Sequence, residues 1–135
     1  MLRLLFDASV VPAALNSTDA LHLPAVSATR GGRDAGHEFI VLMSVLAEVL
    51  VRPARRNVRE LRHGRELTIA TFGPPEPIDE KIAVAAATRR ARHSALRLPD
   101  ALVLATAEVL QADRVLTGDK RWCALDDRVH LIAVA

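Results

Sequence analysis

Short apolar runs separated by amphipathic stretches form the main pattern along this chain. The run Leu2–Phe6 ends at Asp7, and a second run lies within Glu38–Met43, which contains the letters FIVLM. Runs of this kind are typical of strands that are buried in a parallel sheet. The other segments predicted to be strands are Leu67–Ala70, Arg114–Leu116 and Val129–Val134.

Helical spacing of apolar residues, together with proline and glycine positions, predicts helices between these strands. Pro99 suits the first turn of a helix, Pro53 lies near a boundary, and Gly31, Gly32 and Gly36 predict a loop. The predicted helices are Ala8–Leu15, Ser17–Thr29, one that follows Ser44 as N-cap, Ala54–His63, Ile78–Arg92 and Asp100–Leu110. This alternation predicts an α/β fold, namely a three-layer α/β/α sandwich with a mostly parallel five-stranded sheet.

Length and composition are those of one globular domain, which we place at residues 1–135. Half of the residues are hydrophobic, but no apolar run approaches the roughly 20 residues that span a bilayer. Cys123 is the single cysteine, so an intramolecular disulfide is excluded and a reducing compartment is favoured. We therefore expect a cytoplasmic protein that does not associate with a membrane.

The net charge is only +2, but the basic residues are clustered. Six arginines and two glutamates lie between Arg52 and Glu66, and a second basic cluster runs from Arg89 to Arg97. Such clusters attract a polyanion such as RNA, although solvated helix surface is an equally simple explanation. With three Phe, one Trp and no Tyr, the chain lacks an aromatic platform for stacking several bases.

Four acidic residues stand where an α/β sheet places its ligands, beyond the carboxyl ends of the strands. Asp7 ends the first predicted strand, and Asp119 follows another in the loop LTGDKRW. Glu48 and Asp100 lie in early turns of otherwise apolar helices, where an unpaired carboxylate is costly. The four residues are therefore candidates for a common site.

Each acidic residue also has a purely structural explanation. Asp7 could cap the following helix, and Asp100 could interact with its own helix dipole. Glu48 could pair with a nearby arginine, and Asp119 could form a turn with Gly118. Taken one at a time these explanations are favoured, and only the joint pattern supports a shared site.

If the four carboxylates converge, they cannot all ionise without a counter-charge. Mg²⁺ or Mn²⁺ would supply that charge, because both ions prefer oxygen ligands. A bound ion could polarise a phosphodiester and lower the pKa of an attacking water, which would hydrolyse RNA without a nucleophilic side chain.

Other chemistries fit the sequence less well. The five histidines have no zinc-binding spacing, and no GxxxxGK[ST], GxGxxG or GxSxG motif is present. A haloacid-dehalogenase-like phosphatase would carry a second aspartate two residues after the first, where this chain has Ser9. Asp7 also lacks the acidic neighbour that a phosphoryl-aspartate receiver would usually have.

Four blocks of sequence resemble the PIN-domain family, in particular the VapC-like toxins of bacterial toxin–antitoxin pairs. They are LLFDASVV, LMSVLAEVL, LRLPDALVLATA and VLTGDKRW, in the order of the family and over nearly the whole chain. The resemblance implies metal ligands at Asp7, Glu48, Asp100 and Asp119, dependence on Mg²⁺ or Mn²⁺, and cleavage of RNA. It also implies supporting roles for Ser9 and Thr117, a homodimer, and a cognate antitoxin protein that occupies the active-site groove.

Two functions remain open at this point. The first is a metal-dependent endoribonuclease, as the toxin of a type II pair or as a stand-alone processing nuclease. The second is a catalytically inactive PIN-like module that binds RNA or protein. For the first, we expect phosphate contacts from the basic clusters, with Arg52, Arg55, Arg59 and Arg92 as the candidate RNA-binding residues.

Overall fold

A sheet of parallel strands lies at the centre of the computed structural model, which describes residues 1–134. Within this part of the chain the sheet has four strands in the order β2-β1-β3-β4. Their bounds are Arg3–Phe6 for β1, Glu38–Ile40 for β2, Arg114–Thr117 for β3 and Val129–Leu131 for β4. The prediction of a parallel sheet is confirmed, and the prediction of five strands is wrong by one.

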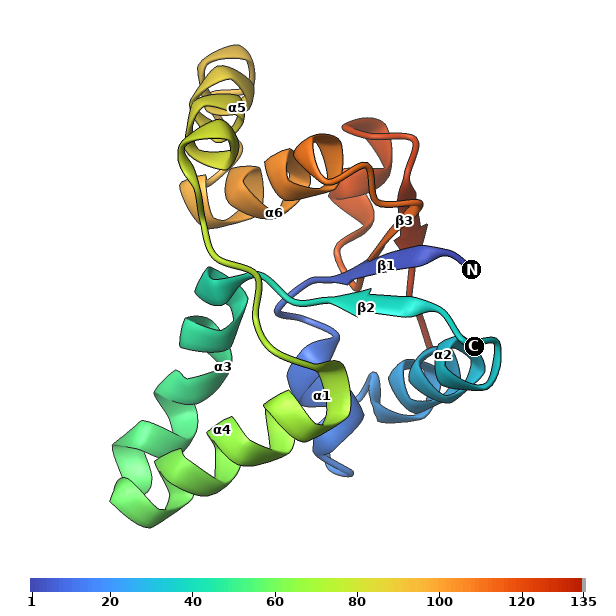
Figure 1. Ribbon diagram of the computed structural model, residues 1–135, viewed down its shortest axis with the longest axis vertical. Coiled ribbons are helices and arrows are strands. Elements are labelled where there is room, and N and C mark those ends of the chain that lie inside the picture. Colours follow the sequence, from blue (N-terminus) through green and yellow to red (C-terminus); the bar gives the residue numbers. More distant parts are fainter. Residues whose placement is uncertain (135) are drawn as a thin grey trace.

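Helices cover both faces of this sheet (Figure 1). Helices α5 and α6 lie above the strands in that view, and α1, α2 and α4 lie below them. The helices are α1 (Val11–Leu15), α2 (His22–Asp34), α3 (Met43–Arg56), α4 (Val58–Phe72), α5 (Glu80–Arg92) and α6 (Leu98–Val109), with a 3-10 helix η1 at Lys120–Ala124. The predicted three-layer α/β/α architecture is confirmed.

The segment Leu67–Ala70 is helical, so the prediction of a strand there is wrong. It belongs to α4, which begins at the N-cap Asn57 and ends before Gly73, whose φ of 90° suits glycine. Thr68 and Phe72, one helical turn apart, are both buried, so this face follows the helical period. A four-residue apolar run is too short to show this period by itself.

Gly31 and Gly32 also lie in a helix, where the sequence predicted a loop. Helix α2 continues to Asp34, and the chain turns at Gly36, which has a φ of 72°. A Cβ at Gly32 would lie 2.8 Å from the Phe39 ring and 3.0 Å from Leu4 Cδ1. Gly32 is therefore required for the close packing of α2 on the sheet, not for a turn.

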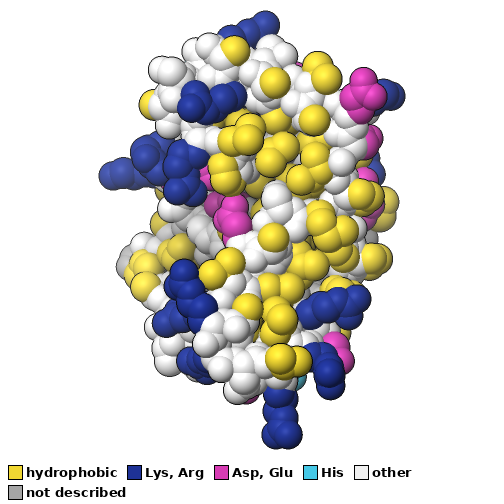
Figure 2. Space-filling model, turned by 90° about the vertical axis from the view of Figure 1, so that its left-hand side faces the viewer, with side chains coloured by type: hydrophobic (Ala, Val, Ile, Leu, Met, Phe, Trp, Pro, Cys, Tyr) yellow, Lys and Arg dark blue, Asp and Glu magenta, His cyan; other side chains and the backbone are white. Residues whose placement is uncertain are grey.

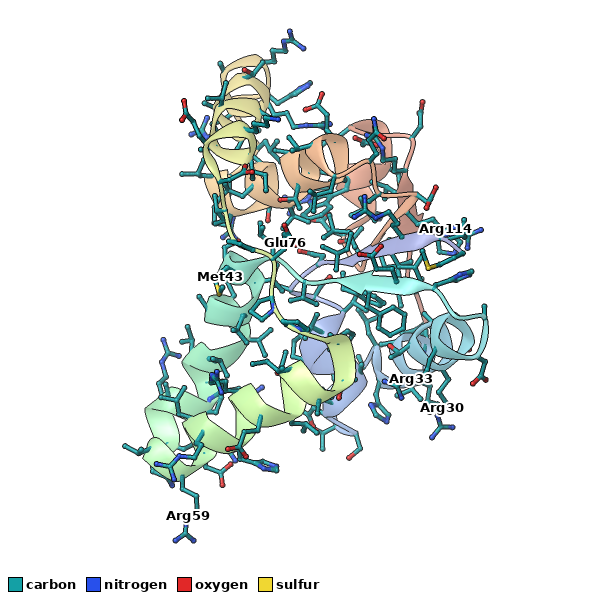
Figure 3. The ribbon with its side chains drawn as sticks, viewed as in Figure 1. Arg30, Arg33, Met43, Arg59, Glu76 and Arg114 are labelled. Carbon is teal, nitrogen blue, oxygen red and sulfur yellow. The ribbon has the colours of Figure 1, made fainter. Side chains whose placement is uncertain are left out.

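The basic segment that was predicted as one helix, Ala54–His63, is divided at Asn57. Helix α3 continues through Pro53 to Arg56, and the Asn57 side chain accepts a hydrogen bond from the Glu60 amide at the start of α4. The N-cap of α3 is Leu42 and not Ser44, which lies in the first turn. Beside it, the Met43 amide donates to the Glu76 carbonyl, and Figure 3 shows the two residues close together.

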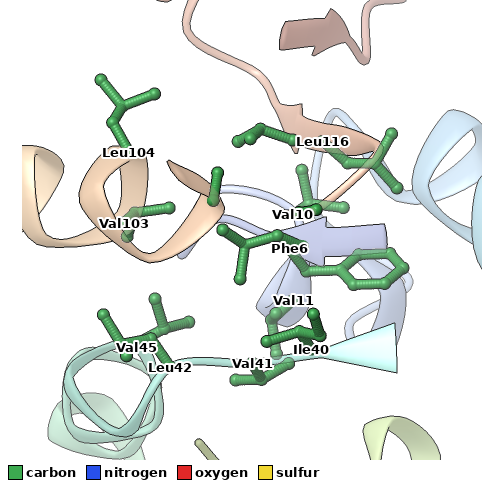
Figure 4. Packing of buried hydrophobic residues seen from close by; sticks show 14 of the residues in the cluster. Phe6, Val10, Val11, Ile40, Val41, Leu42, Val45, Val103, Leu104 and Leu116 are labelled. Carbon is green, nitrogen blue, oxygen red and sulfur yellow. The ribbon is translucent and has the colours of Figure 1, made fainter. Parts of the chain in front are cut away.

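The hydrophobic core fills the space between the sheet and the helices on both of its faces. Phe6 is fully buried in β1, with the rings of Phe39 and Phe72 edge-on at 4.9 and 5.0 Å. Figure 4 shows Val103 and Leu104 of α6 to the left of Phe6, and Val11 and Ile40 below it. Because Phe6 is anchored in this way, the residue that follows it, Asp7, has a fixed position at the edge of the sheet.

The strand order places β1 beside β3, with their carboxyl ends at the same edge. The chain leaves β1 toward β2 on one side, and β3 lies on the other, so this edge is a topological switch point. The Asp7 amide donates to the Leu116 carbonyl over 2.9 Å, which fixes the register of the two strand ends. Within residues 1–134, no helix is both long and apolar enough to cross a membrane.

Candidate active site

Asp7 is the most buried of the four predicted acidic residues, with 7% of its surface exposed. The hydroxyl groups of Ser9 and Thr117 both donate hydrogen bonds to its Oδ2, over 2.8 and 2.9 Å. Two hydroxyl donors on one oxygen hold the carboxylate in one orientation. Asp7 is thus fixed in position by residues from both neighbouring strand ends.

The same two hydroxyl groups also organise the loop after β3. Ser9 Oγ accepts a hydrogen bond from the Gly118 amide over 2.9 Å, and Thr117 Oγ1 accepts one from the Asp119 amide over 3.1 Å. Each hydroxyl therefore links Asp7 to the loop that carries Asp119. Ser9 and Thr117, to which the resemblance gives supporting roles, both lie next to Asp7.

Glu48 and Asp100 enter the same neighbourhood from helices α3 and α6. Partial burial, and then the negative charges of Asp7 and Asp100, raise the pKa of Glu48 above its usual value. Burial and the charge of Asp7 likewise raise the pKa of Asp100, and Asp119 contributes in the same direction. The structure therefore brings the four acidic residues into one cluster of mutually repelling charges.

Asp119 has its own counter-ion, which the sequence reasoning did not identify. Arg121 Nη2 donates to Asp119 Oδ2 over 2.6 Å, and Arg121 Nε donates to Oδ1 over 3.0 Å. This two-pronged contact is the main reason that the pKa of Asp119 lies below its usual value. The Arg121 amide also donates to Asp119 Oδ1. Asp119 therefore forms a local turn and also belongs to the acidic cluster.

Asp100 has a weaker partner in Arg97, whose Nε lies 3.8 Å from Oδ2. The Arg97 side chain is 74% exposed, so solvent screens much of this attraction. In the sequence, the spacing of three residues between Arg97 and Asp100 could have indicated this pair. The short distance between Asp119 and Arg121 in LTGDKRW could likewise have indicated the other pair. Neither residue was selected from the sequence as part of the site.

The donor chemistry of this cluster suits a hard divalent cation, although the present side-chain positions do not enclose one. Among residues 1–134, no three acidic, His or Cys side chains stand close enough together to hold a metal ion. Burial, and then repulsion by neighbouring carboxylates, raises the pKa of Glu48 and of Asp100, and a cation would relieve the repulsion. Carboxylate oxygens are the ligands that Mg²⁺ and Mn²⁺ prefer, so the chemistry of these side chains, though not their present spacing, suits such an ion.

Cavities adjoin this cluster on two sides. One of about 500 Å³ is lined by Asp100 together with Arg92 and Arg121, and one of about 400 Å³ is lined by Glu48 together with Arg52. Figure 2 shows the corresponding charge pattern, with acidic side chains near the middle of one face and basic side chains on two sides of them. Arg52 and Arg92 thus lie beside the acidic cluster.

The other basic residues have different surroundings. Arg55 is exposed in the last turn of α3, and Arg59 points into solvent at the junction of α3 and α4 (Figure 3). Arg89 is mostly buried and pairs with Asp126 over 2.9 Å, and Asp126 also pairs with Arg128 over 3.0 Å. Arg89 therefore ties α5 to the loop before β4, so a structural role accounts for this member of the second basic cluster.

Several solved structures have a fold similar to that of this chain. The toxin–antitoxin complex from Klebsiella pneumoniae contains a chain with 21% identity and a TM-score of 0.74, covering 97% of this chain and 98% of that one. VapBC2 from Rickettsia felis, bound to a promoter DNA fragment, gives 10% identity, a TM-score of 0.72 and 96% coverage of both chains. VapC20 of Mycobacterium tuberculosis, described as a sarcin–ricin loop cleaving toxin, has 20% identity and a TM-score of 0.70. The match covers 90% of this chain and 94% of that one.

At these identities the likeness establishes the fold alone, and no curated protein matches the sequence. The family is established by a separate match, since the family model of the PIN domain covers residues 4–128, from the first residues of β1 almost to β4. The chain belongs to the PIN domain family.

Proposed function

We propose that this protein is a metal-dependent endoribonuclease, the toxin of a type II toxin–antitoxin pair. The observation that carries the proposal is the convergence of carboxylates from β1, α3, α6 and the loop after β3 at one edge of the sheet. The charge of Asp7 adds to burial in raising the pKa of both Glu48 and Asp100, and such perturbed carboxylates are typical of functional sites. A purely structural role would not need this repulsion.

Asp7, Glu48, Asp100 and Asp119 would hold Mg²⁺ or Mn²⁺. When bound, such an ion supplies Lewis-acid polarisation of the scissile phosphate and lowers the pKa of an attacking water. Asp7 is the fixed point of the site, because Ser9 and Thr117 orient its carboxylate. Glu48 and Asp100 stand on rigid helices, so they can adjust by rotation of the side chain alone.

The two arginines that touch the cluster have a natural role with RNA. Arg121 is 82% exposed and Arg97 is 74% exposed, so both guanidinium groups can leave their carboxylates at little cost. Arginine binds phosphate oxygens with the same two-pronged geometry that it uses for carboxylates. Once a cation neutralises the acids, we propose that Arg97 and Arg121 contact the RNA backbone.

The path of the RNA would run across the acidic cluster and past the cavities on its two sides. Arg52 and Arg92 line these cavities and are the favoured phosphate contacts among the predicted residues. Arg55 and Arg59 lie farther along the α3–α4 pair, where they would act on a longer substrate through its general negative charge.

An antitoxin protein and a second copy of this chain are the proposed partners. Structures of similar fold include toxin–antitoxin complexes, which supports the first partner. For the second, Met43, Val84 and Leu98 expose 42%, 60% and 53% of their surfaces on α3, α5 and α6. Figure 2 shows hydrophobic side chains spread over the face that carries α5, as an interface between copies would require.

Purified protein incubated with mixed RNA tests the proposed activity directly. We expect cleavage with Mg²⁺ or Mn²⁺ and none with EDTA. Binding of RNA without cleavage under all metal conditions would favour the alternative, a PIN-like module that binds without cutting. The toxin role further requires a small antitoxin protein encoded beside this chain, and production of the protein with and without such a neighbour would test it, with growth arrest expected only in its absence.

A further inference from the structure

The cavity of about 500 Å³ next to Asp100 has features that the cleavage reaction itself does not require. It lies between the turn that joins α5 to α6 and the 3-10 helix η1. Its volume falls within the roughly 300–1,000 Å³ range of cavities that hold small ligands. Because Asp100 forms part of its wall, whatever occupies it lies beside the acidic cluster.

The lining of this cavity is divided into a basic rim and an apolar floor. Arg92, Arg97 and Arg121 contribute guanidinium groups, whereas Asp100 is the single carboxylate. Leu96 and Trp122, which are 7% and 2% exposed, and the partly buried Leu125 supply the apolar part. A ligand suited to it combines a negative group with a mainly apolar one.

The turn that forms one side of the cavity is held by backbone contacts. The Leu96 amide donates to the His93 carbonyl over 2.9 Å, and Arg90 Nη1 donates to the Ser94 carbonyl over 3.0 Å. Trp122 is fixed on the opposite side, since its amide donates to the Asp119 carbonyl over 3.1 Å. The cavity therefore exists before any ligand binds, which lowers the entropic cost of occupying it.

We propose that this cavity is a subsite for one unpaired nucleotide of the RNA, next to the phosphodiester that is cut. The inference rests on the proposed function and makes it more specific. The base would pack against Leu96 and Trp122, and its phosphate would contact Arg92. An unpaired nucleotide fits the chemistry of the lining, because a base offers an apolar face at every sequence while its phosphate carries the negative charge.

The subsite predicts a preference for single-stranded or looped RNA. A base inside a duplex is stacked and paired, so it must leave the helix before it can enter the cavity. The cavity thus selects for local RNA structure without requiring a base-specific hydrogen bond.

The single tryptophan of the chain gives a direct readout of the cavity. Trp122 is the only Trp and there is no Tyr, so the intrinsic emission of the protein comes from the cavity wall. We would titrate the full-length protein with a short mixed-sequence single-stranded RNA in EDTA, and correct for absorption with free N-acetyltryptophanamide. Total RNA binding would be followed in parallel by the polarisation of a labelled copy.

We expect the RNA to quench Trp122 emission in a saturable way. Arg92→Glu, which reverses a rim charge, and Ala95→Leu, which adds bulk at the lining turn, should each weaken the quenching by about tenfold, or about 1.4 kcal/mol. The matched control is Arg30→Glu on α2, on the other side of the molecule (Figure 3), which should weaken it much less.

RNA binding by polarisation without any change in Trp122 emission would overturn the inference, as would equal effects of Arg92→Glu and Arg30→Glu. Quenching by an acidic peptide but not by RNA would also overturn it, and would assign the cavity to a protein partner. EDTA prevents metal-dependent cleavage, so the titration measures RNA binding alone. The subsite and the nuclease activity can therefore be contradicted independently of each other. RNA that is cut in Mg²⁺ without quenching contradicts the subsite alone, and quenching without cleavage under any condition supports the subsite while contradicting the nuclease.

Discussion

Thr117 donates a hydrogen bond from its hydroxyl to Oδ2 of Asp7 over 2.9 Å, joining residues that are 110 positions apart in the chain. Thr117 is fully buried, and its Oγ1 also accepts from the Asp119 amide. One hydroxyl thus connects the most buried acid of the site with the loop that carries another. The acidic cluster depends on this connection between the ends of β1 and β3.

Replacing Thr117 with valine keeps the shape and removes the hydroxyl group. We expect Thr117→Val to lower activity or metal affinity by about 10–100-fold, as for other residues that orient metal ligands. Thr106→Val is a matched control, because Thr106 is equally buried but donates only to the Leu102 carbonyl within α6. Steady-state cleavage rates and metal titrations of both variants provide the test. Equal losses in the two variants would show that Thr117 is merely structural.

Burial and repulsion raise the pKa of Asp100, which predicts that this carboxylate, needed for the proposed activity, lowers the stability of the metal-free fold at neutral pH. The folded pKa of Asp100 is raised above its ordinary value of 3.8, so the folded protein binds that proton more tightly than the unfolded chain. Stability is therefore undiminished below pH 3.8 and falls as the pH rises through the raised pKa. Without metal at neutral pH, Asp100→Asn should have a higher Tm than the wild type, and the difference should vanish in acid.

Thermal unfolding in EDTA across this pH range measures the effect, with Asp34→Asn at the exposed end of α2 as the control. Glu48→Gln should behave in the same way, since the pKa of Glu48 is raised by the same causes. A lower Tm for both variants at neutral pH would mean that these acids stabilise the fold instead of opposing it.

The two adjacent glycines of α2 predict opposite effects of the same substitution. Gly32→Ala should destabilise the protein by about 1–3 kcal/mol, because its Cβ would overlap the Phe39 ring. Gly31→Ala should stabilise it by about 0.5–1 kcal/mol, because no atom lies within 4 Å of its Cβ and alanine favours the helix. Urea unfolding of the pair measures both values. Similar results for the two variants would contradict the packing of α2 on the sheet.

If the exposed hydrophobic residues of α5 form the proposed dimer interface, a charge introduced among them should prevent self-association. Val84→Glu, at a residue that is 60% exposed on α5, should convert a dimer to a monomer, because a charge cannot be buried there without a partner. Val58→Glu, at a residue 71% exposed at the start of α4, is the control. Size-exclusion chromatography with light scattering reports the mass. A dimer that survives Val84→Glu and not Val58→Glu would place the interface on α4.

The sequence was informative where a residue's role follows from its place relative to one element. Asp7 comes directly after a strand, Asp119 lies in the loop that follows one, and Asp100 interrupts an apolar helix, so their convergence could be predicted from the topology of an α/β sheet. The acids were therefore found without coordinates. Their ligand roles remain predictions.

What the sequence could not show depends on contacts between distant elements. Gly32 looks like a loop residue until Phe39 and Leu4 are known to pack against it. The segment Leu67–Ala70 looks like a strand until Phe72 is seen against Phe6. Arg121 could be noticed beside Asp119, but the two-pronged contact depends on side-chain torsions that no local pattern specifies.

The most direct test of the central proposal is RNA cleavage by the wild type beside Asp7→Asn, Asp100→Asn and the control Asp34→Asn. The proteins would be compared with Mg²⁺, with Mn²⁺ and with EDTA, and their folding checked by circular dichroism. We predict metal-dependent cleavage by the wild type and Asp34→Asn, and none by the other two folded variants. Cleavage that persists in Asp7→Asn and Asp100→Asn, or that continues in EDTA, would contradict a metal-dependent site at these carboxylates.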